Sequence, residues 1–132
     1  MLRLIATVFV TVTLFTAPLA AQEGIDEELA QIKAALESIE SKAEGGDPHA
    51  AFVMASLYHI GIFVAADRPK AIGYLKASSE GGDPDGMYYL ALHMIHGVDM
   101  ERDVEGAKAL FQQAADAGHA PGQLAMDVYL SE

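Results

Sequence analysis

Apolar residues recur at helical spacing along most of this chain. From residue 25 onward they come three and four positions apart, as in Ile25, Leu29, Ile32, Leu36 and Ile39, with charged residues between them. Such spacing gathers the apolar side chains on one face of a helix. It predicts a first amphipathic helix over about 26–43 and a series of shorter helices after it. No segment alternates apolar and polar residues as a strand would, so the sequence predicts an all-α fold.

A second feature of the sequence is a repeat with a fixed offset of 36 residues. The tetrapeptide Gly-Gly-Asp-Pro at 45–48 returns at 81–84. Further pairs that recur at this offset include Ala55 and Ala91, Gly61 and Gly97, Asp67 and Asp103, and Ala71 and Ala107. A period of this length is typical of stacked supersecondary units, none of which buries its apolar face alone.

Residues that begin and end helices fall at regular places within each unit. Asp47 stands at an N-cap position and Pro48 in a first helical turn, which predicts a helix from Pro48 to about Ile60 that Gly61 ends. Asp67 caps a second helix that runs to about residue 79, and its copy runs to about 117. A last helix is expected from about 121 to 132. The fold class is therefore a short α-solenoid of antiparallel helix pairs, with about six helices.

The division of the chain follows from these positions. We expect a leader over 1–21, an N-terminal helix over 22–44, one repeat over 45–80, a second over 81–116, and a partial third repeat or C-terminal cap over 117–132.

The residue pattern within each unit resembles a known family. The first copy reads Ala-Ala-Phe-Val-Met-Ala over 50–55, then Tyr58, Gly61, Val64, Asp67, Lys70-Ala71, Tyr74-Leu75 and Gly82. The second reads Leu90-Ala91, Gly97, Asp103, Ala107, Leu110-Phe111 and Ala-Ala-Asp-Ala-Gly over 114–118. This pattern is similar to the Sel-like (Sel-one) repeat, a relative of the tetratricopeptide repeat, over residues 45–131. The resemblance implies a curved helical surface that binds a partner protein, often in envelope signalling, secretion or cell-wall assembly.

Several positions depart from that family. Phe63 and Asp99 stand where the family has the second glycine of its loop, Met94 replaces a tyrosine, and Asp127 replaces a small residue. Some members are rich in cysteine and are associated with β-lactam binding or hydrolysis. Because this chain has no cysteine, that activity is not expected of it.

The first residues have the composition of a secretory leader. Arg3 precedes an apolar run from Leu4 to Phe15, and small residues follow before Gln22. We expect cleavage after Ala20 or Ala21 and a periplasmic protein, or a secreted one as the alternative. The apolar run is shorter than the ~20 residues that a membrane span needs, so no membrane insertion is expected after cleavage; an uncleaved anchor is the weaker interpretation.

The net charge of the chain disfavours some classes of binding partner. The formal net charge is −11, and such a surface repels nucleic-acid phosphates and anionic lipids. A basic protein surface, a cation, or solubility alone would account for the acidic residues.

Few residues of the sequence are candidates for metal binding or catalysis. His93 and His96 lie three apart with Asp99 beyond them, a spacing that could begin a zinc site, but no further ligands are evident. Packed or exposed histidines are the favoured interpretation, so no metal and no cofactor are expected. With no cysteine, no glycine-flanked serine and no phosphate-binding loop, no catalytic residues are expected, and we interpret the protein as not an enzyme.

Positions off the packing face of the first helix of each unit are the candidates for partner binding. They are Phe52, Ser56, His59, Tyr88, Leu92, His96, Leu124 and Val128. Aromatic and imidazole side chains on such a ladder suit an extended peptide or a partner helix. The alternative is that the apolar members pack against one another. A further alternative is a homo-oligomerising envelope module, because the sequence runs out on a half-repeat that carries Val128, Tyr129 and Leu130. A small hydrolase or metal-binding protein is the least favoured alternative.

Overall fold

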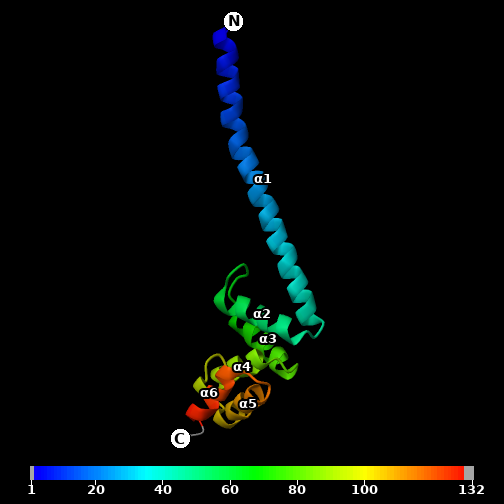
Figure 1. Ribbon diagram of the computed structural model, residues 1–132, viewed down its shortest axis with the longest axis vertical. Helices are drawn as coiled ribbons and strands as arrows, with labels where there is room; N and C mark the ends of the chain where they lie inside the picture. Colours follow the sequence, from blue (N-terminus) through cyan, green and yellow to red (C-terminus); the bar gives the residue numbers. More distant parts are fainter. Residues whose placement is uncertain (1, 130–132) are drawn as a thin grey trace. The chain divides into compact units, whose positions relative to one another are not determined.

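A computed structural model describes residues 2–129, with side chains from residue 23 onward. Over this range the chain forms helices and no strands (Figure 1). The helices are α1 (Leu2–Glu44), α2 (Pro48–Ile60), α3 (Arg68–Glu80), α4 (Pro84–His96), α5 (Val104–Asp116) and α6 (Ala120–Tyr129). The predicted all-α solenoid of about six helices is confirmed.

The first helix differs from its predicted bounds. It begins at Leu2 rather than near residue 26, and no break separates the predicted leader from the amphipathic segment. The cleavage position expected after Ala20 or Ala21 lies outside the residues whose side chains are described. No helix of the described chain contains an apolar stretch long enough to cross a membrane.

The chain divides into two compact units, Met1–Glu37 and Ser38–Glu132. In the first unit the apolar stripe of α1 is exposed: Ile25 is 52% and Leu29 58% accessible. The second unit contains the end of α1 and the five shorter helices, and it carries the repeat.

Aspartate caps define where the repeat helices begin. Asp47 accepts a hydrogen bond from the Ala50 N–H at 2.9 Å, and Asp83 accepts the equivalent bond from the Gly86 N–H at 2.9 Å. The side chains of Asp67 and Asp103 cap α3 and α5 in the same way. These bonds satisfy N–H groups that a helix leaves unpaired in its first turn, and they confirm the capping roles expected from the sequence.

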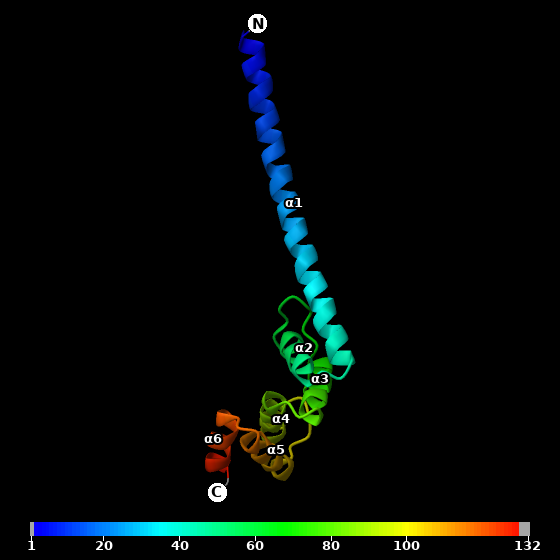
Figure 2. The same ribbon diagram turned by 45° about the vertical axis from the view of Figure 1, so that its right-hand side comes forward.

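Consecutive helices pack side by side, α2 on α3, α3 on α4, α4 on α5 and α5 on α6 (Figures 1 and 2). Small residues hold these contacts close, because Ala55 is 3% exposed and Ala91 fully buried. Phe111 is also fully buried, within a cluster that joins α4, α5 and α6. The core therefore runs through the stack as a row of linked clusters, as expected of a solenoid.

The loop between the two helices of each unit contains a residue with left-handed backbone. Phe63 has φ 64° and Asp99 has φ 59°. These are the two positions where the sequence departs from the glycine of the similar family. Aspartate tolerates this conformation better than other residues with a side chain, whereas a bulky phenylalanine is strained in it.

Candidate functional site

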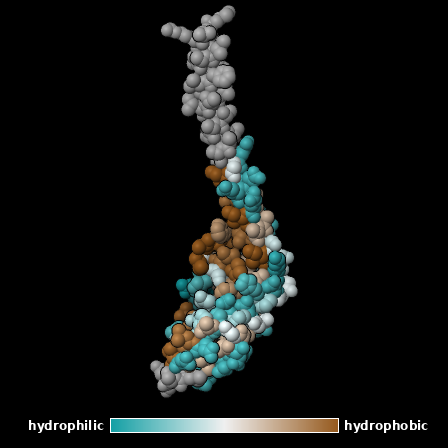
Figure 3. All heavy atoms as spheres, in the orientation of Figure 1, coloured by the Kyte–Doolittle hydropathy of each residue, from teal (hydrophilic) through white to brown (hydrophobic). Residues whose placement is uncertain are grey.

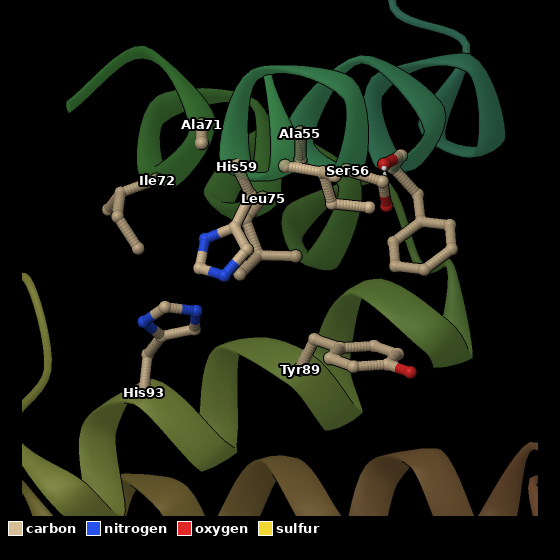
Figure 4. A pocket seen from close by; sticks show the side chains of 10 residues that line it. Ala55, Ser56, His59, Ala71, Ile72, Leu75, Tyr89 and His93 are labelled. Atoms are coloured by element: carbon tan, nitrogen blue, oxygen red, sulfur yellow. Dashed lines mark hydrogen bonds between the residues drawn. The ribbon is translucent and has the colours of Figure 1, made fainter. Parts of the chain in front are cut away.

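An open groove lies between the two repeats of the second unit. It encloses about 210 Å³ and is lined by side chains of α2, α3 and α4 (Figure 4). The apolar part of its lining comes from Ala55 on α2 and from Ala71, Ile72 and Leu75 on α3. This volume suits one large apolar side chain of a ligand rather than a whole cofactor.

Two aromatic rings form one part of the groove wall. The Phe52 ring on α2 and the Tyr89 ring on α4 have centroids 5.5 Å apart. Tyr89 is 46% exposed, so part of its side chain is accessible to a ligand. The Ser56 hydroxyl, which also lines the groove, donates a hydrogen bond to the Phe52 carbonyl at 3.0 Å and is thereby paired within its own helix.

Two imidazoles lie opposite one another in the same groove. His59 from α2 and His93 from α4 have ring centroids 5.6 Å apart and planes at 87°. The Nδ1 of His93 lies 3.0 Å from the Val98 carbonyl oxygen. Because a carbonyl only accepts, Nδ1 carries a proton, and in the neutral imidazole this leaves the lone pair on Nε2. In Figure 4 each ring directs a nitrogen toward the other.

An exposed apolar patch continues from the groove onto the α2–α3 loop. Ile60 lines the groove and is 63% exposed, and Ile62 and Phe63 beside it are 49% and 67% exposed. Figure 3 shows apolar residues gathered in brown areas rather than spread evenly among the polar ones. Contiguous exposed apolar side chains are typical of interaction surfaces.

Three of the predicted binding residues come together in this groove. Phe52, Ser56 and His59 all line it. The others lie elsewhere: His96 is exposed at the end of α4, and Leu124 and Val128 are 66% and 54% exposed on α6. Whether any of these residues binds a partner stays a prediction.

Tyr88 and Leu92 occupy the next groove along the stack, which is filled. Both pack against the buried cluster of α4, α5 and α6. Tyr129, which stands 36 residues after His93, stacks on Phe111 with centroids 5.6 Å apart and planes at 2°. The equivalent of the open groove in the second repeat is thus occupied by the protein's own side chains.

Tyr89 and His93 were missed as groove residues for a geometric reason. The 36-residue period makes Tyr88 the equivalent of Phe52. Neighbouring helices of a stack face each other with opposite sides, so a groove combines positions 52, 56 and 59 of one unit with the other side of the next helix. Shifting the register by one residue would have found Tyr89 and His93.

Outside the groove, a polar cluster joins the end of α1 to the first repeat. Lys70 Nζ lies 2.6 Å from the Tyr58 hydroxyl and 3.0 Å from Glu40 Oε1. The Tyr74 hydroxyl donates to the same carboxylate at 3.2 Å. The hydrogen bond from Lys70 lowers the pKa of Glu40, and the bonds to Tyr58 and Glu40 raise the pKa of Lys70.

These directions suit a structural ion pair rather than catalysis. A catalytic lysine needs a lowered pKa to carry a lone pair near neutral pH, and the shift of Lys70 is the opposite. Burial raises the pKa of Tyr74, so its phenol also stays protonated. The cluster fixes residues 38–44 of α1 to α2 and α3.

Two of the three residues that could begin a zinc site, His93 and Asp99, have different partners. Asp99 pairs with Arg68, with 3.3 Å between carboxylate and guanidinium, while His93 bonds the Val98 carbonyl. Within residues 23–129, no group of three or more His, Cys, Asp or Glu side chains is placed to hold a metal ion.

A family model and two solved structures match this chain. A model of the Sel1 repeat matches residues 48–83 and 84–119. The crystal structure of a Sel1 repeat protein from Oxalobacter formigenes is similar, with a TM-score of 0.69 and 26% sequence identity over 72% of this chain and 71% of that one. The crystal structure of a protective antigen of uropathogenic Escherichia coli with an SLR fold is also similar, with a TM-score of 0.65 and 20% sequence identity. The match covers 70% of this chain and 20% of that one. At this identity the likeness supports the fold alone. No curated protein matches the chain.

Proposed function

Because this chain belongs to the Sel1 repeat family, we propose that it is a non-enzymatic scaffold of the periplasm that binds a protein or peptide segment in the groove between α2 and α4. The observation that carries this proposal is the groove itself. It is open and apolar, it lies between two repeats, and it continues into the exposed side chains of Ile60, Ile62 and Phe63. Proteins rarely leave contiguous apolar side chains exposed unless these side chains bind another molecule.

The chemistry of the groove specifies the kind of segment. Its volume of about 210 Å³ suits one large apolar side chain, packed against the adjoining rings of Phe52 and Tyr89. Aromatic and apolar anchors in such pockets contribute most of the binding energy of many interfaces.

Charge favours a basic segment around that anchor. Residues 38–129 contain six Lys and Arg against thirteen Asp and Glu. Several of those cations are already paired, Lys70 with Glu40 and Arg68 with Asp99. Excess negative charge attracts lysine- and arginine-rich segments and speeds their association.

Peptide display against the purified protein tests this proposal. We expect the selected peptides to share one large apolar residue flanked by Lys or Arg. Tyr89→Ala should weaken their binding at least tenfold, since it removes half of the aromatic wall. Leu124→Ala is the control, because Leu124 is also a large exposed side chain but lies on α6 outside the groove. Selection of acidic peptides, or equal binding to the Tyr89 variant, would contradict the proposal.

Export is supported by the sequence of residues 1–21 alone. Intact-mass measurement on protein recovered from the periplasm should show that the first 20 or 21 residues are missing. A mass that retains them would refute cleavage, and recovery only from the cytoplasm would refute export.

The absence of catalysis is supported by the pairing of the chain's reactive groups. The Ser56 hydroxyl bonds its own helix, and Lys70 is held protonated by Tyr58 and Glu40. Within the described residues, neither group has the activated state that nucleophilic chemistry needs.

Homo-oligomerisation is the second candidate, favoured by the exposure of Leu124 and Val128 on α6. Light scattering over a range of concentrations separates the two candidates. A monomer at all concentrations would exclude the oligomer, whereas a stable dimer disrupted by Leu124→Asp would establish it.

A further inference from the structure

We propose that His59 and His93 form a binding site for a divalent transition metal of the zinc and copper class, at one end of the groove. The two residues belong to consecutive repeats, and their rings meet across the space between α2 and α4 (Figure 4). This pair differs from the His93 and His96 pair that the sequence singles out, because His96 does not line the groove.

The distance between the rings matches that of two imidazoles on one ion. A zinc ion about 2.1 Å from each nitrogen lies about 3.2 Å from each ring centroid, so two ligated rings have centroids between about 5 and 6.4 Å apart. The observed separation is 5.6 Å. The angle of 87° between the ring planes lets each ring direct a nitrogen lone pair, which lies in its own plane, to a shared point.

The hydrogen bond of His93 supplies a second, independent observation. Its Nδ1 donates to the Val98 carbonyl at 3.0 Å, which leaves the lone pair on Nε2. Histidines that bind metals almost always donate their other ring N–H to a carbonyl or carboxylate, which fixes the tautomer and the ring orientation. His59 has no hydrogen bond among the described residues, so its ring nitrogens are available.

The lining of the groove places no charged side chain, of either sign, beside the two imidazoles. No lysine or arginine lines the groove, and the net charge of −11 raises the local concentration of cations. Imidazole nitrogen suits zinc, copper and nickel better than magnesium or calcium. Since no third protein ligand is placed nearby within residues 23–129, water completes the coordination, and the affinity is that of a two-ligand site.

Zinc titration of the untagged protein tests the site. Calorimetry should show one zinc ion per chain, and the imidazole resonances of His59 and His93 should shift together while those of the other three histidines do not. His59→Ala and His93→Ala should each lower the zinc affinity at least tenfold, because one imidazole alone holds zinc weakly. Acidification should release the ion, since protons compete for the same nitrogens.

His96→Ala is the matched control, because it removes an exposed imidazole from the same helix without touching the groove. We expect its zinc affinity to stay within twofold of the parent. The proposal is overturned if zinc does not bind, if His59→Ala or His93→Ala binds zinc as the parent does, or if the resonances that shift belong to other histidines. The resonance shifts are measured on the parent protein, so the test stands even if a variant fails to fold.

Discussion

Replacing Gly86 by alanine tests the packing between the two repeats. Gly86 lies in the first turn of α4 and is buried. A Cβ there would overlap the Ser78 hydroxyl and lie 2.8 Å from the Ser78 Cβ and 3.0 Å from its carbonyl carbon. Ser78 is fully buried on α3, so it has no space to withdraw. Forcing a methyl group into such a contact destabilises a protein by about 1 to 3 kcal/mol.

Gly73→Ala is the control for this substitution. Gly73 lies on the exposed side of α3, and a Cβ there would meet nothing within 4 Å. Alanine should therefore stabilise α3 by up to about 1 kcal/mol through its higher helix propensity. Urea unfolding followed by circular dichroism should separate the two variants by about 2 to 4 kcal/mol. If Gly86→Ala is as stable as Gly73→Ala, α3 and α4 do not pack as described.

A second substitution locates the clash. The Ser78 hydroxyl is buried and has no hydrogen-bond partner among the described residues. Ser78→Ala should therefore leave stability unchanged or raise it, since an unpaired buried hydroxyl destabilises by about 1 to 3 kcal/mol. In the double variant with Gly86→Ala it should recover part of the lost stability, with a coupling of at least about 0.5 kcal/mol. Strictly additive effects would mean that the two side chains do not meet.

Three other substitutions test separate parts of the fold by the same unfolding assay. Phe63→Gly should raise stability by up to about 1 kcal/mol, because glycine adopts φ 64° without the strain that a side chain brings; a loss would show that the exposed ring contributes packing. Ala91→Leu should lower stability by about 1 to 3 kcal/mol, because Ala91 is fully buried between helices, and an unchanged midpoint would contradict the register. Glu40 has a lowered pKa because of Lys70, so its contribution is present above pH 4.5 and lost as the pH falls below it. Glu40→Gln should flatten this acid dependence, and an unaltered pH profile would refute the role of the pair.

The helices and their caps could be predicted from the sequence because their signals are local. Asp47 and Pro48 begin α2 at the predicted residue, and Gly61 ends it with φ 78°. The 36-residue offset then carries the same bounds into the second unit. The start of α1 could not be predicted in this way, since no capping residue or glycine pair separates residues 1–21 from the amphipathic segment.

The groove was only partly predictable because it depends on how helices face each other. The period places Phe52 and Tyr88 in equivalent positions, yet Phe52 lines an open groove and Tyr88 packs beside Phe111. What differs is the residue on the following helix. His93 leaves the first groove open, and Tyr129 fills the second by stacking on Phe111. Such a difference between copies lies in the pairing of positions from neighbouring units, which a comparison of equivalent positions does not reveal.

Photocrosslinking in cells that export the protein tests most directly whether the groove binds a partner. A benzoylphenylalanine replaces Tyr89 in the groove or, in a separate variant, Leu124 on α6, and irradiated adducts are identified by mass spectrometry. We predict a covalent adduct at position 89 with a basic segment that carries a large apolar residue, and none at position 124. An adduct formed from position 124 but not from position 89 would contradict binding in the groove.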